Sequence, residues 1–353
     1  MKYRSYGNTG EMVSTLGFGC MRLPEVEING EWYIDEEKAL PLLFKAYENG
    51  INYFDSAPYY CHSNSEYAMG KALKSVRDKV MLTTKLPLDT VKQPSDMRRM
   101  LENSLKKMDS PYIDFYHFWG INKGSLEHIK AKDLFHEARK LKEEGLIRHM
   151  CFSFHDEPEN MIDIIDAGEG ILESVLCQYN LLDRANEQSI AYARKKGLGV
   201  AAMGPVGGGR LAAPTELYKK LTGKESIATY ELALRFVLGN EDVSLALSGM
   251  QDIEMLEKNL AIANVETYMT KTEWDKVAIA MEEIKKFSEL YCTGCNYCQP
   301  CPQNIIIPKI FNMYTYHNVY GLTGVAKGEF ENYKKRTSKE RIDLFKTANQ
   351  EVL

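Results

Sequence analysis

Short apolar runs and amphipathic helical patterns alternate along the chain from Leu16 to Ala263. Short apolar runs bounded by turn residues predict buried strands, and apolar positions three and four residues apart predict helices. The candidate strands centre near Leu16, Tyr53, Leu82, Phe115, Met150, Val175, Val200 and Leu245. The candidate helices are Asp35–Asn49, Ser65–Val76, Pro94–Met108, Leu126–Glu144, Glu157–Ala167, Glu187–Lys196, Thr229–Leu238 and Asp252–Ala263. Strand–helix units in this number and order predict an α/β fold, a (β/α)8 TIM barrel.

A doubly wound α/β sheet would show the same alternation. Such sheets commonly carry a G-x-G-x-x-G turn between the first strand and its helix, and this chain has none there. The chain has 353 residues and 44% apolar content, which is enough for one large barrel core or for two ordinary domains. We therefore expect the barrel.

Both ends of the predicted barrel carry additional segments. The opening residues contain a turn signal at Asn8–Gly10 and predict an N-terminal β-hairpin. A helical stretch, Lys271–Glu289, leads into a cysteine-rich segment, after which no strand pattern is evident. We expect a barrel domain over residues 1–286 and a mostly helical, cysteine-rich extension over residues 287–353.

The overall charge and hydropathy exclude some classes of protein. The net charge of −5 gives no reason to expect nucleic-acid or membrane binding. The N-terminus lacks the apolar core of a signal peptide, and no apolar run approaches the roughly 18 residues that span a bilayer. We expect a soluble, cytoplasmic protein.

Two neighbouring predicted strands end in ionisable residues. The run Ile51–Asp55 ends in an acid, the next run ends at Lys85, and Tyr60 lies five residues past the acid. The carboxyl ends of barrel strands form the active-site face. There, an ammonium group lowers the pKa of a phenol from its usual value of about 10, and a carboxylate keeps the ammonium group charged. These three residues therefore predict a proton-transfer unit.

Several segments resemble the aldo-keto reductase family. The stretch FDSAPYY, followed by SEYAMGKAL, is similar to that family's Asp-x-Ala-x-x-Tyr signature. The stretches GLIRHMCFSFH, CQYNLLDR, AMGPVGGGRL and SGMQDIEMLEKNL resemble later family segments in the same order, so that the resemblance covers residues 3–262. It implies a (β/α)8 barrel that binds an extended nicotinamide dinucleotide, NADP(H) or NAD(H), without a Rossmann domain.

The resemblance also implies a reaction and the residues that perform it. Hydride would pass from the nicotinamide ring to the carbonyl carbon of a small-molecule aldehyde or ketone. Tyr60 would protonate the carbonyl oxygen, Lys85 would lower the pKa of Tyr60, and Asp55 would pair with Lys85. The catalytic set is completed by Trp119, at a position where the family commonly carries His, five residues past the acid Asp114.

The resemblance assigns cofactor-binding positions as well. Ser153 and Gln178 would bind the carboxamide of nicotinamide, and Met203 takes the position of an aromatic residue that often stacks on that ring. Backbone amides of the glycine-rich loop would face the pyrophosphate, and the segment after the eighth strand would face the adenosine. The loop positions are Gly204, Pro205, Val206, Gly207 and Gly209, and the adenosine positions are Ser248, Gly249, Met250, Lys258 and Asn259. Lys258 is the one basic residue among these, which predicts a weakened preference for NADPH and favours NADH.

Trp119 leaves the substrate class open. An indole N–H donates a hydrogen bond but cannot relay a proton. His117 points to the same side of its strand but deeper, where we expect a core histidine with satisfied hydrogen bonds. His62 and His155, on neighbouring loops, are alternative donors. Two other functions remain open: enone (C=C) reduction, and a cofactor-binding redox sensor or regulatory protein with little turnover.

Four cysteines lie close together after the barrel. Cys292, Cys295, Cys298 and Cys301 are each separated by two residues, and a proline follows the last. The first three have the spacing of a [4Fe–4S] loop, and zinc is an alternative. The segment is similar to that of an anaerobe-type subgroup of aldo-keto reductases with a ferredoxin-like extension, which implies exchange with a ferredoxin-like electron carrier. No cysteine follows Cys301, so we expect at most one cluster, with Cys301 as its fourth ligand.

Overall fold

The computed structural model describes the chain except for residues 182, 208–228, 287–300, 304, 319–321 and 349–353. The chain divides into two compact units, which are residues 1–207 with 233–270 and residues 208–232 with 271–353. The domain boundary near residue 287 therefore stays a prediction.

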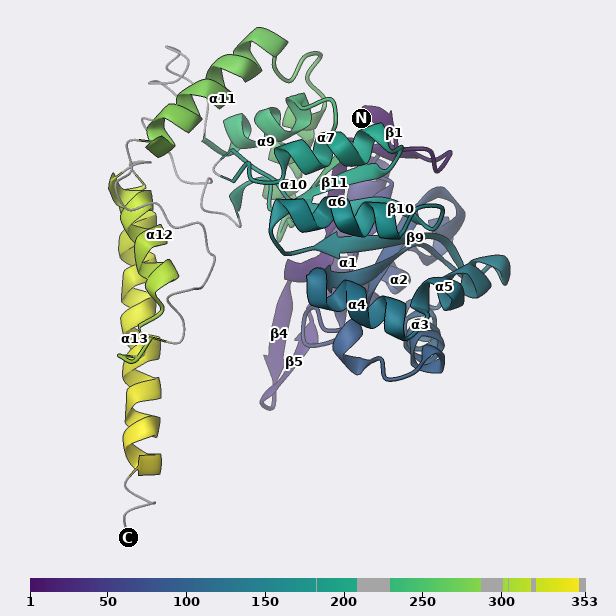
Figure 1. Ribbon diagram of the computed structural model, residues 1–353, viewed down its shortest axis with the longest axis horizontal. Helices are drawn as coiled ribbons and strands as arrows, with labels where there is room; N and C mark the ends of the chain where they lie inside the picture. The colour runs from purple at the N-terminus through teal and green to yellow at the C-terminus, as the bar shows by residue number, and fades with distance from the viewer. Residues whose placement is uncertain (182, 208–228, 287–300, 304, 319–321, 349–353) are drawn as a thin grey trace. The chain divides into compact units, whose positions relative to one another are not determined.

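The first unit is built on a closed barrel of parallel strands, which confirms the predicted fold class (Figure 1). Around the barrel the strands follow the order β10-β11-β12-β3-β6-β7-β8-β9, and β12 closes the sheet by pairing with β3. Their bounds are β3 Leu16–Gly19, β6 Tyr53–Asp55, β7 Met81–Pro87, β8 Ile113–Ile121, β9 Ile147–Phe154, β10 Leu172–Gln178, β11 Gly199–Met203 and β12 Leu245–Ser248. Within the described residues, each candidate strand of the sequence is present.

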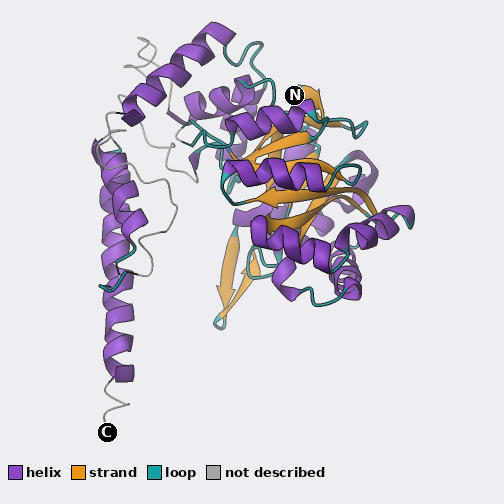
Figure 2. Ribbon diagram, viewed as in Figure 1, coloured by secondary structure: helices purple, strands orange, loops and turns teal. Residues whose placement is uncertain are grey.

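Helices surround this barrel, as Figure 2 shows by the purple layer outside the orange strands. They are α1 Glu36–Glu48, α2 Ser65–Leu73, α3 Pro94–Met108, α4 Lys123–Ala131, α5 Leu134–Glu143, α6 Pro158–Ala167, α7 Glu187–Lys195, α9 Thr229–Gly239 and α10 Ile253–Ala263. One predicted helix, Leu126–Glu144, is instead two. The chain breaks between α4 and α5 because Asp133 adopts a left-handed conformation, which ends a right-handed helix.

The predicted N-terminal hairpin is confirmed and closes the amino end of the barrel. Its strands are β1 Tyr3–Ser5 and β2 Met12–Ser14. Tyr6, in the connection between them, is fully buried, with its ring centroid 4.9 Å from that of Phe115. Phe115 lies near the start of its strand, so Tyr6 fills the barrel interior at the end opposite the carboxyl ends of the strands.

A second hairpin was not predicted from the sequence. Strands β4 Glu25–Ile28 and β5 Glu31–Ile34 pair antiparallel and extend from the barrel between β3 and α1 (Figure 1). Asn29 and Gly30 connect the two strands with positive φ, as in a tight two-residue turn. Because this hairpin follows the carboxyl end of β3, it rises from the carboxyl face of the barrel.

In the second unit the described residues are largely helical, in agreement with the predicted extension. The helices are α11 Lys271–Lys286, α12 Ile307–Asn318 and α13 Thr323–Ala348. The backbone amide of Ile306 donates a hydrogen bond to the Tyr333 hydroxyl at 3.1 Å and so links the start of α12 to α13. Among the helices of the described residues, none combines the length and the apolar character needed to cross a bilayer.

Candidate functional site at the carboxyl ends of the strands

The strand register gathers the predicted catalytic side chains inside the barrel. Alternate residues of a strand point to one side, so Asp55 shares the inward face of β6 with the core residue Tyr53. Asp55 lies beside Thr83 of β7, and Lys85, two residues further on, lies beside His117 of β8. The β-strand repeat therefore aims groups from three neighbouring strands into one volume.

Asp55 and Lys85 form a buried ion pair. Lys85 Nζ donates hydrogen bonds to Asp55 Oδ2 and to the Ser56 carbonyl oxygen, both at 2.6 Å. The other carboxylate oxygen, Asp55 Oδ1, accepts a hydrogen bond from Thr83 Oγ1 at 2.6 Å. Neither charged side chain is more than 3% exposed. Burial lowers the pKa of Lys85, but the combined effect of Asp55 and Tyr60, which raise it, is larger. The pKa of Lys85 therefore lies above its ordinary value, and the amine is a cation at neutral pH.

Tyr60 lies directly against this ion pair. Lys85 Nζ is 4.6 Å from the centroid of the Tyr60 ring. The Tyr60 ring also meets Trp119 edge to face, with centroids 5.7 Å apart. The structure thus brings Asp55, Tyr60, Lys85 and Trp119 together at the carboxyl end of the barrel.

The net acidification expected of Tyr60 is not seen. Burial raises the pKa of its phenol, Lys85 lowers it, and Asp55 raises it again, so that the pKa lies above 10.0. Lys85 acts in the expected direction, but its charge is partly balanced by the neighbouring carboxylate. Tyr60 therefore keeps its proton at neutral pH.

Trp119 is half-buried and belongs to an aromatic group above the ion pair. The exposed Tyr59 also packs against it, with ring centroids 5.6 Å apart. Gly120 follows with a positive φ, and a Cβ atom there would lie 3.9 Å from His155 Cδ2. His155 therefore adjoins the site, and partial burial together with Lys85 lowers its pKa and favours the neutral ring.

The other two candidate histidines lie in different surroundings. His62 Nδ1 lies 2.7 Å from Glu25 Oε1, and its ring stacks on Trp32 of the second hairpin. His117 is fully buried, as expected for a core histidine. Burial lowers the pKa of His117 to about 4, which leaves the ring neutral.

The two positions predicted for the nicotinamide carboxamide lie on adjacent strands. Ser153 Oγ is buried and accepts a hydrogen bond from the Gly120 amide at 2.8 Å, while its own O–H proton has no acceptor among the described residues. The side-chain amide of Gln178 likewise makes no hydrogen bond within the described part of the chain. It is held against Gly204, where a Cβ atom would lie 2.8 Å from Gln178 Oε1. These unused donor and acceptor groups fit a carboxamide ligand.

The loop after β11 begins with the predicted pyrophosphate-binding residues. Gly204 and Gly207 have positive φ, and the Gly207 amide donates to the Gly204 carbonyl oxygen at 2.8 Å, which closes a turn that contains Pro205 and Val206. Met203 is half-buried and packs against the barrel core. Gly209 lies outside the described residues.

In the predicted adenosine segment, one side-chain hydrogen bond links β12 to α10. Asn259 Nδ2 donates to the buried Ser248 Oγ at 3.2 Å, and the Gly249–Met250 pair follows β12, with the Met250 side chain fully buried. Lys258, the predicted basic residue, forms an ion pair with Glu254 at 2.6 Å.

The amino end of α10 itself is acidic. Asp252 caps it by accepting a hydrogen bond from the Met255 amide at 2.7 Å, and Glu254 lies in its first turn. Glu254 thus offsets the charge of Lys258, and Asp252 adds a further negative charge at the amino end of α10.

The predicted metal ligands fall mainly outside the described residues. Cys292, Cys295 and Cys298 are among the residues not described, and Cys301 is a free, half-buried thiol. No group of three or more His, Cys, Asp or Glu side chains that could hold a metal occurs in the described ranges.

Three supporting residues of the site were not identified from the sequence. Thr83 orients Asp55, the Ser56 carbonyl oxygen binds Lys85, and Asn180 Nδ2 donates to the Gly204 carbonyl oxygen at 3.0 Å. Thr83 could have been found, because it precedes Lys85 by two residues and so shares its face of the strand. The other two contacts depend on backbone geometry, which carries no residue-type signal.

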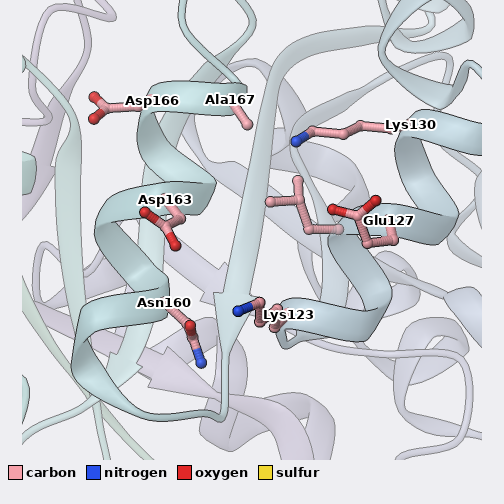
Figure 3. A pocket seen from close by; sticks show the side chains of 8 residues that line it. Lys123, Glu127, Lys130, Asn160, Asp163, Asp166 and Ala167 are labelled. Atoms are coloured by element: carbon pink, nitrogen blue, oxygen red, sulfur yellow. The ribbon is translucent and has the colours of Figure 1, made fainter.

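A groove elsewhere on the first unit is separate from this site. It has a volume of about 370 Å³ and lies between α4 and α6, in the outer helix layer (Figure 3). Its lining residues are Lys123, Leu126, Glu127, Lys130, Asn160, Asp163, Asp166 and Ala167. None of the predicted site residues lines it, and we assign no part of the reaction to it.

Known proteins share this architecture. The L-galactose dehydrogenase of Arabidopsis thaliana is 28% identical over 315 residues, which cover 82% of this chain and 97% of that protein. An uncharacterized oxidoreductase, YqkF of Bacillus subtilis, is 26% identical over 75% of this chain and 92% of its own length. The solved aldo-keto reductase AKR11C1 from Bacillus halodurans, in its holo form, superposes with a TM-score of 0.67 at 26% identity, over 78% of this chain and 95% of that one.

The sequence profile of the Aldo/keto reductase family matches residues 15–281, which include all of the barrel strands described above. The family match and the oxidoreductases among the relatives support an oxidoreductase. The chain belongs to the aldo/keto reductase family.

Proposed function

We propose that this protein reduces the carbonyl group of an aldehyde or ketone with a nicotinamide dinucleotide as reductant, and that Tyr60 donates the proton. The observation that carries the proposal is the buried Lys85–Asp55 ion pair, whose ammonium nitrogen lies 4.6 Å from the Tyr60 ring. A buried charge pair is costly unless good geometry and additional hydrogen bonds compensate for the lost hydration. Here it fixes a positive charge beside the Tyr60 phenol, at the carboxyl ends of β6 and β7.

The charges around Tyr60 are consistent with a general acid that donates one proton in each turnover. A bound dihydronicotinamide ring would supply the hydride. As negative charge develops on the carbonyl oxygen, Tyr60 gives up its proton, because an alkoxide is far more basic than a phenolate. The Lys85 ammonium group then stabilises the phenolate, and Asp55 keeps that ammonium group charged and oriented. The raised pKa of Tyr60 keeps the donor protonated before each turnover.

The cofactor would lie across the carboxyl ends of β9 to β12. The unused groups of Ser153 and Gln178 would hold the carboxamide, and the turn that begins at Gly204 would face the pyrophosphate. In this arrangement Trp119 and Tyr59 form an aromatic surface beside the proton donor, which favours a planar or bulky substrate.

We expect replacement of Tyr60 by Phe to remove the proton donor while keeping the ring in place. The value of kcat should fall by roughly 10²- to 10⁴-fold, since general acid catalysis contributes on that order. Cofactor affinity should change by less than about twofold, because the hydroxyl acts in the chemical step. Steady-state rates with a panel of aldehydes, ketones and enones, and cofactor titration by fluorescence, measure both.

The same substitution at the exposed Tyr67 of α2 is the matched control and should leave kcat unchanged. Retention of most turnover by Tyr60→Phe would refute the assigned role. If the wild-type protein reduces only the enones of the panel, Tyr60 would instead act in C=C reduction.

The charges at α10 lead us to propose a weak preference for NADPH, with NADH as a competent reductant. Lys258 is paired with Glu254, and Asp252 occupies the helix cap. A dianionic 2′-phosphate gains little from a lysine that is already neutralised, and a nearby carboxylate repels it.

Fluorescence titration should therefore give dissociation constants for NADPH and NADH within about tenfold of each other. The variant Gln251→Arg places a positive charge directly before the cap and should tighten NADPH binding while leaving NADH unchanged. Asn264→Arg adds the same charge at the far end of α10, roughly 16 Å away, and should change neither. Binding of NADPH to the wild type a hundredfold tighter than NADH would contradict the proposal.

The cysteine spacing supports a second component. We propose that Cys292, Cys295, Cys298 and Cys301 bind one [4Fe–4S] cluster, as in the anaerobe-type subgroup that the segment resembles, and that a ferredoxin-like carrier exchanges electrons with it. Thiolates separated by two residues are typical of cluster loops. Zinc bound by the same thiolates is the alternative.

Anaerobically purified protein should contain about four iron and four sulfide per chain. Cys298→Ala should lose both, whereas Cys177→Ala, which alters a buried thiol in β10, should retain them. Stoichiometric zinc without sulfide would replace the cluster by the zinc alternative, and protein with neither would refute a metal centre.

A further inference from the structure

The loop that carries Tyr60 has an unusual backbone. Cys61, His62 and Ser63 follow Tyr60 directly, and their φ angles are 49°, 50° and 69°. Side chains with a Cβ atom disfavour the left-handed region, and a run of three such residues is rare. A segment of this kind keeps its conformation only when contacts around it enforce that conformation.

The second hairpin supplies those contacts from one side. Glu25 of β4 holds His62 by the 2.7 Å contact, and the Trp32 ring of β5 stacks on His62 with centroids 5.5 Å apart and planes inclined by 13°. The amide of Asn64, the next residue, donates to the Trp32 carbonyl oxygen at 3.1 Å. Two of these contacts thus fall on His62, within the left-handed run, and the third falls on Asn64, the residue directly after it.

The barrel side of the loop has anchors as well, of which the shortest is the hydrogen bond from Ser65 Oγ to the Cys20 carbonyl oxygen at 2.7 Å. Cys61 Sγ donates to the carbonyl oxygens of Cys20 and Met21 at 3.4 and 3.5 Å. Lys107 of α3 approaches the carbonyl oxygens of Pro58 and Ser63, both at 3.4 Å. At His62, in contrast, the described side-chain contacts come from the hairpin.

We propose that the β4–β5 hairpin is a positioning element for the reaction: Glu25 and Trp32 hold the left-handed turn at residues 61–63 and thereby fix the Tyr60 hydroxyl over Lys85. The inference rests on the proposed role of Tyr60. The hairpin contributes no group to the proton-transfer cluster itself, and the inference gives it control over the position of the proton donor.

The two faces of the hairpin provide the contrast needed for a test. In the register of the pair, Glu27 lies opposite Trp32, and Val26 lies opposite Tyr33. Glu25 and Trp32 therefore share the face that meets the loop, whereas Tyr33 projects from the other face and its hydroxyl bonds to Glu31 of its own strand. Trp32 and Tyr33 are 43% and 42% exposed, so their substitutions disturb similar amounts of surface.

The experiment compares Trp32→Ala and Glu25→Ala with Tyr33→Ala in the full-length, cofactor-loaded protein. We expect kcat to fall roughly tenfold in the first two, because a displaced proton donor slows the chemical step. The cofactor dissociation constant and the midpoint of thermal unfolding should stay at wild-type values. Hydrogen–deuterium exchange of peptides covering residues 57–64 should become faster in Trp32→Ala and Glu25→Ala, and should not change in Tyr33→Ala.

A rescue separates loss of loop conformation from general damage. Glycine adopts positive φ without a steric penalty. Adding Ser63→Gly to Trp32→Ala should therefore raise kcat about threefold or more above that of Trp32→Ala alone. In the protein with the wild-type hairpin, Ser63→Gly should leave kcat near the wild-type value. Absence of rescue, or equal losses in Trp32→Ala and Tyr33→Ala, would overturn the inference.

Failure of the inference and failure of the proposed function give different results. If Tyr60→Phe abolishes turnover while Trp32→Ala and Glu25→Ala behave as wild type, the hairpin does not position the donor, and the proposed function stands. If Tyr60→Phe retains turnover, the proposed function fails. Faster exchange of residues 57–64 in Trp32→Ala would then show only that the hairpin stabilises the loop.

Discussion

The buried contact between Lys85 and Asp55 determines what the rest of the site can do. An amine with 1% of its surface exposed would lose its charge if it stood alone, because burial penalises the cation. Asp55 reverses that effect, and Thr83 and the Ser56 carbonyl oxygen satisfy the remaining groups of the pair. Removal of one partner from such a pair leaves an uncompensated charge and costs about 3–5 kcal/mol in other proteins. The pair is therefore both a structural bond between β6 and β7 and the source of the positive charge beside Tyr60.

The regular geometry of the barrel strands brings the residues of this contact together. The two-residue repeat of a strand sends Asp55, Lys85 and Trp119 inward, and the parallel register sets them at successive heights. Tyr6 of the N-terminal hairpin fills the opposite end, so the open end of the barrel interior is the one with the ionisable groups. Tyr60 differs from the others because it stands on a loop, and its position depends on contacts that the barrel alone does not provide.

The parts of this structure that follow from local rules could be predicted from the sequence. Strand and helix positions follow from apolar periodicity, and Asp55, Lys85 and Trp119 follow from where strands end. The break at Asp133 could not be predicted, because an aspartate is compatible with either a helix or a turn. The β4–β5 hairpin is a different case: its signal is present in the sequence, because Asn29–Gly30 joins the alternating stretch Glu25–Ile28 to the stretch Glu31–Ile34, and it was not recognised. The net pKa of Tyr60 depends on the balance of burial against two opposite charges, and sequence order does not contain that balance.

The central claim is that Asp55 keeps the buried Lys85 amine charged. The direct measurement is the pKa of the Lys85 side chain, followed by nitrogen NMR of lysine-labelled protein and assigned by its loss in Lys85→Met. In the wild type the amine should remain protonated up to a pH above its ordinary pKa of about 10.5. In Asp55→Asn, where burial acts without the carboxylate, the pKa should fall below that value. An unchanged pKa in Asp55→Asn would contradict the account.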